Sequence, residues 1–431
     1  MSLHQEVLER AEEYNVKFVR LQFTDIFGRL KNIAIPVEEL PRALEGKITF
    51  DSSAVDGGVG SREADIHLLP DPATFVIFPW RPREGAVARL ICDVFTPKGE
   101  PYGCCSRSIL KKELARLREK GLELQVGAEI EFYLLQTDSQ GKPLPVAHDR
   151  AGYCDLTPVD LGENARRDMV LTLQEMGFEV SSSHHEIYPG QHEIFLKEGP
   201  ALTIADSIVT FKFVVRTIAQ RHGLHASFMP RPFNEYGGSG MHLHLSLWQG
   251  EKNAFSDPEK EYGLSALAGS FLAGLIRHAG ALTAVGNPLV NSYKRLLSSD
   301  NGAPVVAAWS EEERRTMLRV PAPRLAETRI IWRSPDPTAN PYLALAAVLT
   351  AGMDGVEKEE KLPPPFPAEG EKRLLPRHLA EALTALAEDA VVRQTLGEEI
   401  CRRYLSVKKE EWERYQSRVH PWELEEYLLH Y

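Results

Sequence analysis

Strand-like segments that carry several ionisable side chains on one face constrain the fold of this chain more than any other feature. In VGAEIEFYLL, Glu129 and Glu131 share one face of a strand, because side chains alternate with period two. In HHEIYPGQHEI, Glu186 and Glu193 flank a Pro-Gly turn, so a hairpin-like bend could bring them to one point. A solvent-facing strand or a polar loop would explain either segment alone. Carboxylates within apolar sequence are costly to bury unless a cation or a proton compensates them.

A third segment adds imidazole groups to these carboxylates. In GGSGMHLHLSL, His242, His244 and Ser246 share a strand face after a glycine-rich stretch that permits close backbone approach. A single histidine here would more often be a satisfied core residue, but two on one face favour a site. Carboxylates and imidazoles from three separated strands form an oxygen-rich ligand set. Such a set suits Mg²⁺ or Mn²⁺ rather than zinc.

The segment TRIIWRSPDPTANPY carries two arginines on the face of another predicted strand. Arg329, Ile331 and Arg333 occupy alternate positions. Two guanidinium groups about 7 Å apart repel each other by roughly 2 kcal/mol at an effective dielectric constant near 20. A carboxylate between them would relieve this repulsion, but the sequence has isoleucine there. Either an anionic ligand supplies the charge, or this face has lost an acidic residue.

Further arginines lie within the preceding forty residues of this segment. Arg295 follows NSYK, and Arg314 and Arg319 precede the two arginines already described. The run EEERR (311–315) alone would fit a solvated charged face, but RVPAPR and WRSP place arginines beside apolar residues and prolines. Guanidinium forks match phosphate and carboxylate geometry. Metal ligands together with arginines predict phosphoryl transfer involving an anionic substrate. The chain has no GxxxxGK[ST] loop, which disfavours a P-loop fold.

Composition restricts the class of protein. The chain has 431 residues, enough for more than one domain, and its formal net charge of −11 disfavours a non-specific binder of nucleic acid or anionic membrane. No apolar run is long enough to span a bilayer, and the acidic N-terminal segment does not resemble a signal peptide. Five cysteines without a CxxC pair do not predict a disulfide framework or a zinc ribbon. These features predict a cytoplasmic protein.

The chain divides into two regions of different character. After a helix that ends near Tyr14, residues 16–37 predict two strands joined by a turn at Asp25 to Gly28. This β-rich region ends near TPKGEPYGCC (96–105), where proline and glycine cluster. Ser106 or Ser108 is expected to cap the next helix. The second region alternates strands with helices. Its predicted strands span 124–135, 178–196, 224–229, 241–248 and 328–333, and its predicted helices span 160–177, 202–222, 264–281 and 338–352.

Several of these motifs, in this order along the chain, strongly resemble the glutamine synthetase family. The resemblance rests on VGAEIEF, HHEIYPGQHE, GSGMHLHLSL, NSYKRL and RSPDPTANPYLALAAVLTAGMDG, with FDSSA near the start and WERYQSRVHPWELEEYL near the end. It implies an α+β fold, with a small N-terminal β-grasp domain over residues 1–104. The larger catalytic domain, residues 105–431, is expected to have a curved antiparallel sheet and flanking helices, as in glutamine synthetases and guanido kinases.

The resemblance also implies an activity. Members of this family use ATP to phosphorylate the γ-carboxylate of L-glutamate, and ammonia then displaces the phosphate. The resemblance implies Mg²⁺ or Mn²⁺ as cofactor and a double-ring homo-oligomer, usually a dodecamer. In such an oligomer the N-terminal loop of one subunit completes the active site of its neighbour.

The residues that match the family's motifs have implied roles. The metal ligands would be Glu131, Glu186 and Glu193 at a first site, and Glu129 and His242 at a second site. The catalytic residues would be Asp51, Asp65, Arg314 and Arg333, with Asp51 binding and deprotonating ammonium. The substrate glutamate would be bound by Gly238, Arg295, Arg314 and Arg333. ATP would be bound by His244, Ser246, Arg319 and Arg329.

This sequence also departs from the family's pattern at several site positions. Ile331 replaces a glutamate that is the third protein ligand of the second metal, so we expect weaker binding there. Gly237 replaces an asparagine that contacts glutamate, and Ser181 replaces a glutamate on the nucleotide side. Ala326 or Glu327 stands in place of a lysine near ATP. The flap after NSYKRL has no glutamate and offers only Asp300, Asn301 and Gly302.

Two main hypotheses follow from these matches and departures. The first is an active ATP-dependent ligase that joins glutamate to ammonia or to another amine. The second is a catalytically impaired paralogue with a structural, regulatory or co-assembly role, for example by co-assembling with an authentic glutamine synthetase. A third hypothesis, phosphagen-type kinase chemistry, is disfavoured because the N-terminal region and Asp51 match the synthetases.

Overall fold

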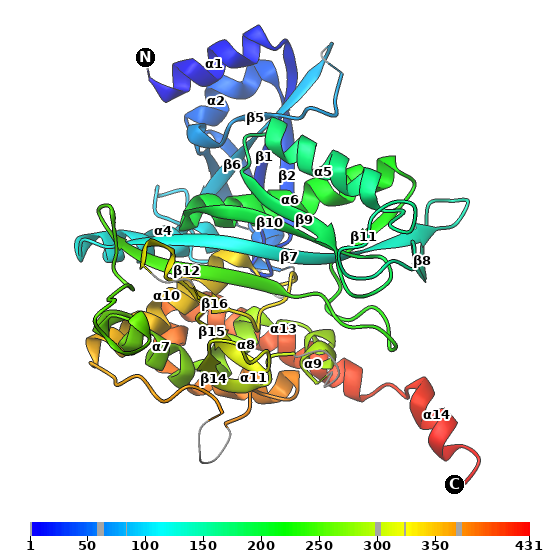
Figure 1. Cartoon of the computed structure of the whole chain (residues 1–431). Helices are drawn as coiled ribbons and strands as arrows, with labels where there is room; N and C mark the ends of the chain where they lie inside the picture. The colour runs from blue at the N-terminus through cyan, green and yellow to red at the C-terminus, as the bar shows by residue number, and fades with distance from the viewer. Residues whose placement is uncertain (1, 58–63, 83, 298–302, 323–324, 368–372) are drawn as a thin grey trace.

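The computed structural model describes residues 2–57, 64–82, 84–297, 303–322, 325–367 and 373–431. Figure 1 shows a small N-terminal unit on one side of a long sheet, with a layer of helices on the other side. The last helix, α14 (Pro421–Tyr427), extends away from the body of the molecule. Among the helices in the described ranges, none combines the length and apolar character needed to cross a bilayer.

The N-terminal unit is built around a mixed sheet with the strand order β2-β1-β6-β4-β3, and β5 pairs with β6. The central pair, β1 and β6, is parallel, whereas β1 and β2 form an antiparallel hairpin. This confirms the small β-rich unit expected from the sequence. Its strands are β1 (Val16–Thr24), β2 (Leu30–Pro36), β3 (Ile48–Asp51), β4 (Asp65–Pro70), β5 (Val76–Ile77) and β6 (Ala86–Phe95). Its helices are α1 (Leu3–Glu13), α2 (Leu40–Leu44) and α3 (Ser53–Asp56).

The predicted turn between β1 and β2 packs against the larger unit, which contains Asn340. Gly28 has a φ of +74°, and a Cβ atom there would lie 2.7 Å from Cα of Asn340. Asn340 caps the helix that follows it, and its Nδ2 donates a hydrogen bond to the carbonyl oxygen of Ile26 at 3.2 Å. Glycine is therefore required both by the backbone conformation and by the close approach of the second unit.

The larger unit contains a second sheet with the order β14-β15-β16-β12-β7-β10-β9. Neighbouring strands in this path are antiparallel, except for the parallel pair β14–β15. Figure 1 shows β7 crossing most of the width of the molecule, with helices on both sides of the sheet. The strands are β7 (Glu123–Thr137), β8 (Pro143–Ala147), β9 (Val180–His185), β10 (Gln191–Pro200), β11 (His225–Ser227), β12 (Met241–Gln249), β13 (Lys252–Asn253), β14 (Val306–Ser310), β15 (Thr316–Arg319) and β16 (Ile330–Trp332).

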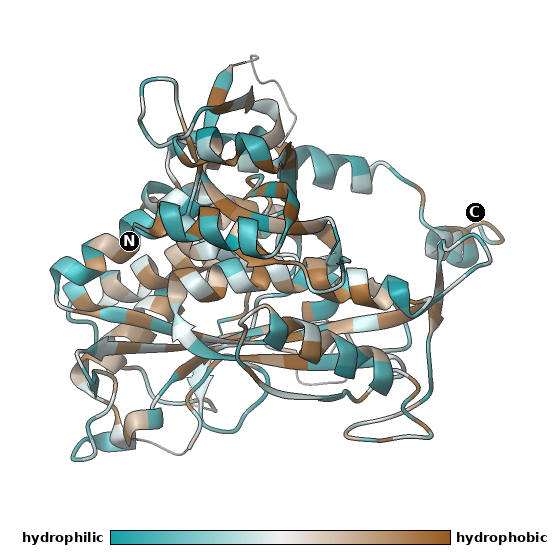
Figure 2. Ribbon diagram, turned by 90° about the horizontal axis from the view of Figure 1, so that it is seen from above, coloured by the Kyte–Doolittle hydropathy of each residue, from teal (hydrophilic) through white to brown (hydrophobic). Residues whose placement is uncertain are grey.

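Helix α10 (Pro341–Glu357) is the centre of the helical layer. Most of its side chains are buried, and it packs against α4, α6, α7, α8 and α12. Figure 2 shows hydrophobic residues concentrated along the strands and inner helices, and hydrophilic residues on the outer helices and loops. These features confirm the expected α+β class. The other helices are α4 (Ser106–Glu119), α5 (Glu163–Glu175), α6 (Ala201–Arg221), α7 (Ala266–Arg277), α8 (Ala279–Gly286), α9 (Val290–Leu296), α11 (Leu379–Glu388), α12 (Ala390–Leu396) and α13 (Glu398–Gln416).

Some elements differ from the predictions. Cys105, not a serine, precedes α4, and it makes no side-chain capping hydrogen bond. The predicted strand 178–196 is two strands, β9 and β10, because the Pro-Gly turn reverses the chain. The predicted helix 264–281 is divided at His278 into α7 and α8. The sequence does not predict strands β14 and β15, because both are short and almost wholly buried and therefore show no period-two alternation.

The break at His278 holds a buried ionic cluster that makes stability depend on pH. His278 Nδ1 lies 2.6 Å from Asp389, and its Nε2 lies 3.0 Å from Asp354. Burial lowers the pKa of His278, but the hydrogen bonds to the two aspartates outweigh burial and raise it above its usual value. A raised histidine pKa stabilises the fold below the unfolded-state pKa of about 6.5, and this contribution is lost as the pH rises through the folded-state pKa.

We therefore expect the destabilisation caused by His278→Asn to shrink as the pH rises from about 6 to about 9. The melting temperatures of wild type and variant, measured across this range, test the expectation. His430→Asn, at the exposed C-terminal end, is the matched control. A difference in melting temperature that does not change with pH would contradict the proposed charge on His278.

Candidate active site

The residues singled out in the sequence surround one cavity in the larger unit. It has a volume of about 730 Å³ and lies where β7, β9, β10, β12 and β16 come together. Carboxylates form one side of it and arginines another. The predicted residues that line it are Glu129, Glu131, Glu186, Glu193, Gly237, Gly238, His242, Arg295, Arg314, Arg319, Ile331 and Arg333.

Strand register brings the four carboxylates together. Glu193 on β10 lies opposite Glu131 on β7, and Glu129 lies opposite His242 on β12. The Pro-Gly turn returns the chain so that ligand atoms of Glu186 and Glu193 lie within 4.8 Å of each other. The hairpin-like bend expected from the sequence is thus confirmed. Glu131 is held in place by hydrogen bonds from the backbone N–H of Gly240 at 2.8 Å and from Nε2 of Gln191 at 3.1 Å.

The electrostatics of this cluster fit a bound cation. Burial, and then repulsion from Glu131, Glu129 and Glu186, raises the pKa of Glu193 to about 10. Burial also raises the pKa of Glu131, although His242 lowers it, and Glu186 adds a smaller increase. Such shifts mean that the negative form of these two carboxyls is disfavoured in the protein alone, and a bound divalent cation would stabilise it. The oxygen donors suit Mg²⁺ or Mn²⁺.

Ligand atoms gather into two overlapping groups around Glu193. One group is Glu129, Glu193 and His242, and the other is His184, Glu186 and Glu193. Within each group the atoms lie within 4.8 Å of one another. Two adjacent cation positions would fit these donors, and the predicted ligand Glu131 belongs to neither group. His184 lies in the quoted motif two residues before Glu186, so the period-two rule could have identified it.

The two histidines on β12 both approach Glu129. His242 Nδ1 lies 3.0 Å from one carboxylate oxygen, and His244 Nε2 lies 3.0 Å from the other. Although burial opposes it, these interactions lower the pKa of Glu129 far below its usual range. His244 is buried and does not line the cavity, and Ser246 donates a hydrogen bond to Glu198. His242 is the histidine of this strand that faces the cavity.

Another part of the cavity lining is basic. Arg295 is buried, and its Nη1 and Nη2 donate to the carbonyl oxygens of Ser334 and Arg333 at 2.8 and 3.2 Å. Arg333 donates to the carbonyl oxygen of Arg314. Burial, and then repulsion from Arg295 and Arg319, lowers the pKa of Arg333 to about 10. This concentration of positive charge favours an anion such as phosphate or carboxylate in the cavity.

Ile331 lies on β16 between the two walls. It pairs with His244 of β12 on one side and with Arg319 of β15 on the other, and its side chain is only 5% exposed. An aliphatic side chain offers no ligand atom, so the group formed by Glu129 and His242 gains no donor from this strand. The isoleucine therefore contributes an apolar side chain to a cavity that is otherwise lined by many charged groups.

Several predicted residues do not line the cavity. Strand β16 contains only three residues, so Arg329 falls outside it and donates to the carbonyl oxygen of Glu327 at 3.3 Å. Asp51, the last residue of β3, lies opposite Asp65, the first residue of β4, in the N-terminal unit. Ser181 is also absent from the lining, whereas its neighbour Ser182 contributes to it. The flap residues Asp300, Asn301 and Gly302 lie outside the described residues.

An aromatic residue explains why position 237 is glycine. A Cβ atom on Gly237 would lie 2.3 Å from Cε2 of Tyr188, so the tyrosine ring leaves no space for a side chain there. The phenolic oxygen of Tyr133 donates to the carbonyl oxygen of Gly237 at 2.7 Å and fixes the segment. Sequence reasoning missed Tyr188, and no periodic signal connects these two positions. A tyrosine in HHEIYPGQHE is the only indication.

Comparison with known proteins gives a consistent result. Residues 15–97 match the model of the glutamine synthetase beta-Grasp domain, and residues 103–427 match that of the glutamine synthetase catalytic domain. The chain is 49% identical to a glutamine synthetase of Clostridium saccharobutylicum and 48% identical to one of Thermus thermophilus, and each alignment covers 99% of both chains. A glutamine synthetase of Staphylococcus aureus is 45% identical over 99% of this chain and 98% of its own.

Solved structures agree with the sequence comparisons. A GmaS/ADP complex and a ligand-free GmaS each superpose with a TM-score of 0.88, at 32% and 33% identity. Each covers 98% of this chain and 99% of the solved chain. The two family models together span nearly the whole chain, and their order is that of the β-grasp and catalytic units described above. The chain belongs to the glutamine synthetase family.

Proposed function

We propose that this protein is an ATP-dependent ligase that forms a γ-glutamyl amide from L-glutamate and ammonia or another amine, through γ-glutamyl phosphate. One observation carries the proposal: a single cavity is lined by both a converging carboxylate cluster and several arginines. Cations on the carboxylates and anions on the arginines fit phosphoryl transfer between ATP and a carboxylate. The likeness to a GmaS structure in complex with ADP supports nucleotide binding by this chain.

We assign the residues of the two walls as follows. Glu131, Glu186 and Glu193 hold a first Mg²⁺ or Mn²⁺, and Glu129 and His242 hold a second. These ions neutralise phosphate charge in the reaction. Arg295, Arg314, Arg333 and the backbone at Gly238 bind glutamate and the transferring phosphoryl group. ATP is bound on the side of the cavity that contains Arg319. Three further residues, Arg329, His244 and Ser246, contribute to ATP binding although they do not line the cavity.

The N-terminal unit has a role that requires a second subunit. Asp51 and Asp65 do not line the cavity of their own chain. We propose that they complete the active site of a neighbour in a ring-shaped homo-oligomer, a dodecamer, and that Asp51 binds and deprotonates ammonium there. We place the boundary between the N-terminal and catalytic domains at residues 104 and 105. The ranges of the two family matches support a division near this point.

A second candidate function is a catalytically impaired paralogue that regulates an authentic glutamine synthetase by co-assembly. The observation that favours it is the isoleucine in the cavity wall, since Ile331 supplies no ligand to the second cation. Loss of a preorganised electrostatic group can cost about 10²–10³-fold in rate. The proposed ligands Glu131, Glu186 and Glu193 and four of the five predicted arginines line the cavity, which favours the ligase.

Phosphate release separates the two candidates. The protein is incubated with ATP, Mg²⁺ and L-glutamate, first with and without ammonium and then with a panel of primary amines. Release that rises with ammonium or with one of the amines establishes a ligase and identifies the amine. ATP binding without release for any amine would exclude the ligase and favour the impaired paralogue.

The role of Ile331 gives a direct prediction. We expect Ile331→Glu to raise Mn²⁺ affinity at the second site about tenfold or more, because outer groups around metals already change affinity about 10–100-fold. The new carboxylate would also lie beside Arg319 and relieve repulsion in the basic wall. Mn²⁺ titration, followed by phosphate release, measures the effect. Ile331→Gln is the matched control, since it adds similar volume without charge. Equal Mn²⁺ affinity in both variants would show that a carboxylate at position 331 does not bind the second cation.

A further inference from the structure

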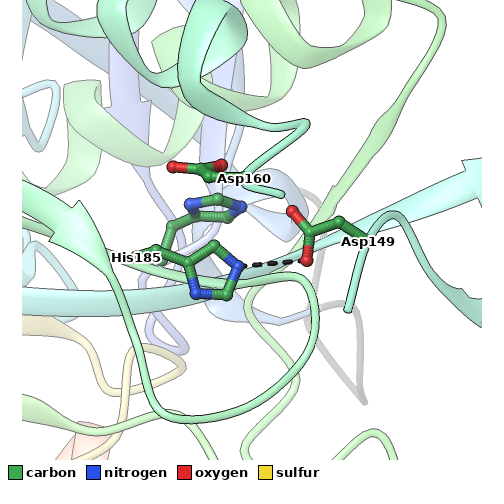
Figure 3. Close-up of side chains that lie close together, drawn as sticks. Asp149, Asp160 and His185 are labelled. Carbon is green, nitrogen blue, oxygen red and sulfur yellow. Dashed lines mark hydrogen bonds and ion pairs between the residues drawn. The ribbon is translucent and has the colours of Figure 1, made fainter. Parts of the chain in front are cut away.

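A second, fully buried cluster lies directly behind the carboxylate hairpin. His185 and His192 each precede a cavity carboxylate, Glu186 and Glu193, by one residue, so their side chains project to the opposite face of the sheet. Both histidines are 0% exposed. Figure 3 shows His185 directed at Asp149, with Asp160 close to them. The cluster is outside the cavity lining and has no part in the chemistry proposed above.

Asp149 contacts both arms of the turn that carries the proposed ligands. One of its oxygens, Oδ1, lies 3.0 Å from Nε2 of His185 and accepts a hydrogen bond from the backbone N–H of Gly190 at 2.8 Å. His185 Nδ1 in turn lies 2.7 Å from the carbonyl oxygen of Glu186. Both partners of the ring are acceptors, so both ring nitrogens donate. One carboxylate therefore fixes the backbone at Glu186 and at the end of the Pro-Gly turn.

The turn itself has little freedom to move independently of this cluster. Gly190 has a φ of +68°, and a Cβ there would lie 2.8 Å from the carbonyl oxygen of Leu134. On the other side, the backbone N–H of Cys154 donates to the carbonyl oxygen of His185 at 3.0 Å. This bond anchors the loop whose Tyr153 packs edge-on against His184, with ring centroids 5.3 Å apart. His185, which Asp149 contacts, thus connects the hairpin to the loop that carries Tyr153, a residue of the cavity lining.

A buried metal centre is the alternative role for this cluster. Ligand atoms of Asp149, Asp160, His185 and His192 lie within 4.8 Å of one another, and among the described residues His192 Nε2 and Asp149 Oδ2 have no hydrogen-bond partner. However, Arg166 already lies within the cluster. Its Nη1 donates to Asp160 at 2.7 Å and lies 2.9 Å from His192 Nδ1. The guanidinium group supplies positive charge at the place where a cation would be needed, which favours a hydrogen-bonded network over a metal.

We propose that Asp149 and His185 are positioning residues, which hold the Glu186–Glu193 hairpin in the geometry that binds the first cation. The inference rests on the proposed function only through the assignment of Glu186 and Glu193 as ligands. Residues that orient metal ligands from behind typically change metal affinity about 10–100-fold when they are replaced. Asp149 does so through backbone atoms, and it does not touch the cation or the substrate.

Mn²⁺ affinity, measured without ATP, glutamate or amine, tests the proposal in two matched variants. Asp149→Asn and Asp160→Asn each remove one buried negative charge from the same cluster, but only Asp149 contacts the hairpin backbone. We expect Asp149→Asn to weaken Mn²⁺ binding about tenfold or more. The Mn²⁺ affinity of Asp160→Asn should stay within about twofold of wild type, even if its melting temperature falls as much as that of Asp149→Asn. His185→Gln retains a donor toward Asp149 and loses the donor toward the Glu186 carbonyl oxygen. It should weaken Mn²⁺ binding as Asp149→Asn does. It replaces Asp149→Asn if the Asp149 variant does not fold.

Three results would overturn the proposal. Unchanged Mn²⁺ affinity in the Asp149 and His185 variants would show that the hairpin does not need them. Equal weakening in Asp160→Asn would show a general structural effect. Stoichiometric zinc in the purified wild-type protein, lost in Asp149→Asn, would show a metal centre instead. Failure of the proposed function is separate: weakened Mn²⁺ binding in the Asp149 variant alone, with no amine-dependent turnover in wild type, would retain the positioning role and reject the ligase.

Discussion

Replacing Glu131 with glutamine is expected to lower amine-dependent phosphate release by about 10²–10³-fold, the cost typical of losing one preorganised electrostatic group. Glu131 is the central carboxylate of the acidic wall, opposite Glu193 in register and oriented by hydrogen bonds from Gly240 and Gln191. Glutamine keeps the volume and one acceptor oxygen, so the wall should keep its shape. It removes the charge that binds a cation, and Mn²⁺ affinity should therefore fall together with turnover.

Glu123→Gln provides the matched control for this experiment. Glu123 begins the same strand, β7, but its side chain is exposed and outside the cavity lining. It should retain wild-type Mn²⁺ affinity and turnover. If Glu131→Gln behaved like Glu123→Gln in both measurements, Glu131 would not be a ligand of the first cation, and the acidic wall would need another explanation.

The second large effect is expected from Arg333→Met, which should also lower turnover by about 10²–10³-fold. Arg333 lines the cavity close to other arginines, and burial together with Arg295 and Arg319 lowers its pKa to about 10. An anion in the cavity removes this repulsion, so the arginine interacts most strongly when phosphate charge is present. Methionine keeps most of the side-chain length and removes the charge. Mn²⁺ affinity should therefore change little, in contrast to the Glu131 variant.

Steady-state kinetics with varied ATP and glutamate measure this effect. A fall in kcat larger than the rise in KM would show that Arg333 stabilises the negative charge that develops in the transition state of phosphoryl transfer. Arg402→Met, on an exposed part of α13, is the control. Turnover in Arg333→Met within about threefold of the control would contradict the assignment, because a transition-state contact should cost at least about 10²-fold.

The sequence predicted those parts of the site that depend on local periodicity. Glu129 and Glu131 share a face because β7 is long and regular, and the Pro-Gly turn brought Glu186 to Glu193 as expected. The same rule failed at Arg329. Strand β16 begins one residue too late to include it, and strand ends are set by pairing with β12 and β15 rather than by the segment's own residues.

Contacts between distant segments explain the features that could not be predicted. The missing side chain at Gly237 is explained by the ring of Tyr188, some fifty residues earlier in the chain, and nothing in either segment specifies that approach. Asp149 similarly lies in a loop that reads as polar and irregular, but its carboxylate is buried against the hairpin. Such tertiary contacts follow from the packing of the sheet and not from the hydrophobic pattern of a segment.

The route through γ-glutamyl phosphate is the central claim, and one measurement tests it most directly. L-Glutamate with a heavy oxygen isotope at both oxygens of its γ-carboxylate is incubated with the protein, ATP, Mg²⁺ and the amine that stimulates phosphate release. If the carboxylate attacks the terminal phosphorus of ATP and the amine then displaces phosphate, one carboxylate oxygen leaves with that phosphate. We predict one heavy oxygen in the released phosphate for each γ-glutamyl amide formed. Unlabelled phosphate, released without amide, would show hydrolysis of ATP by water and contradict the ligase mechanism.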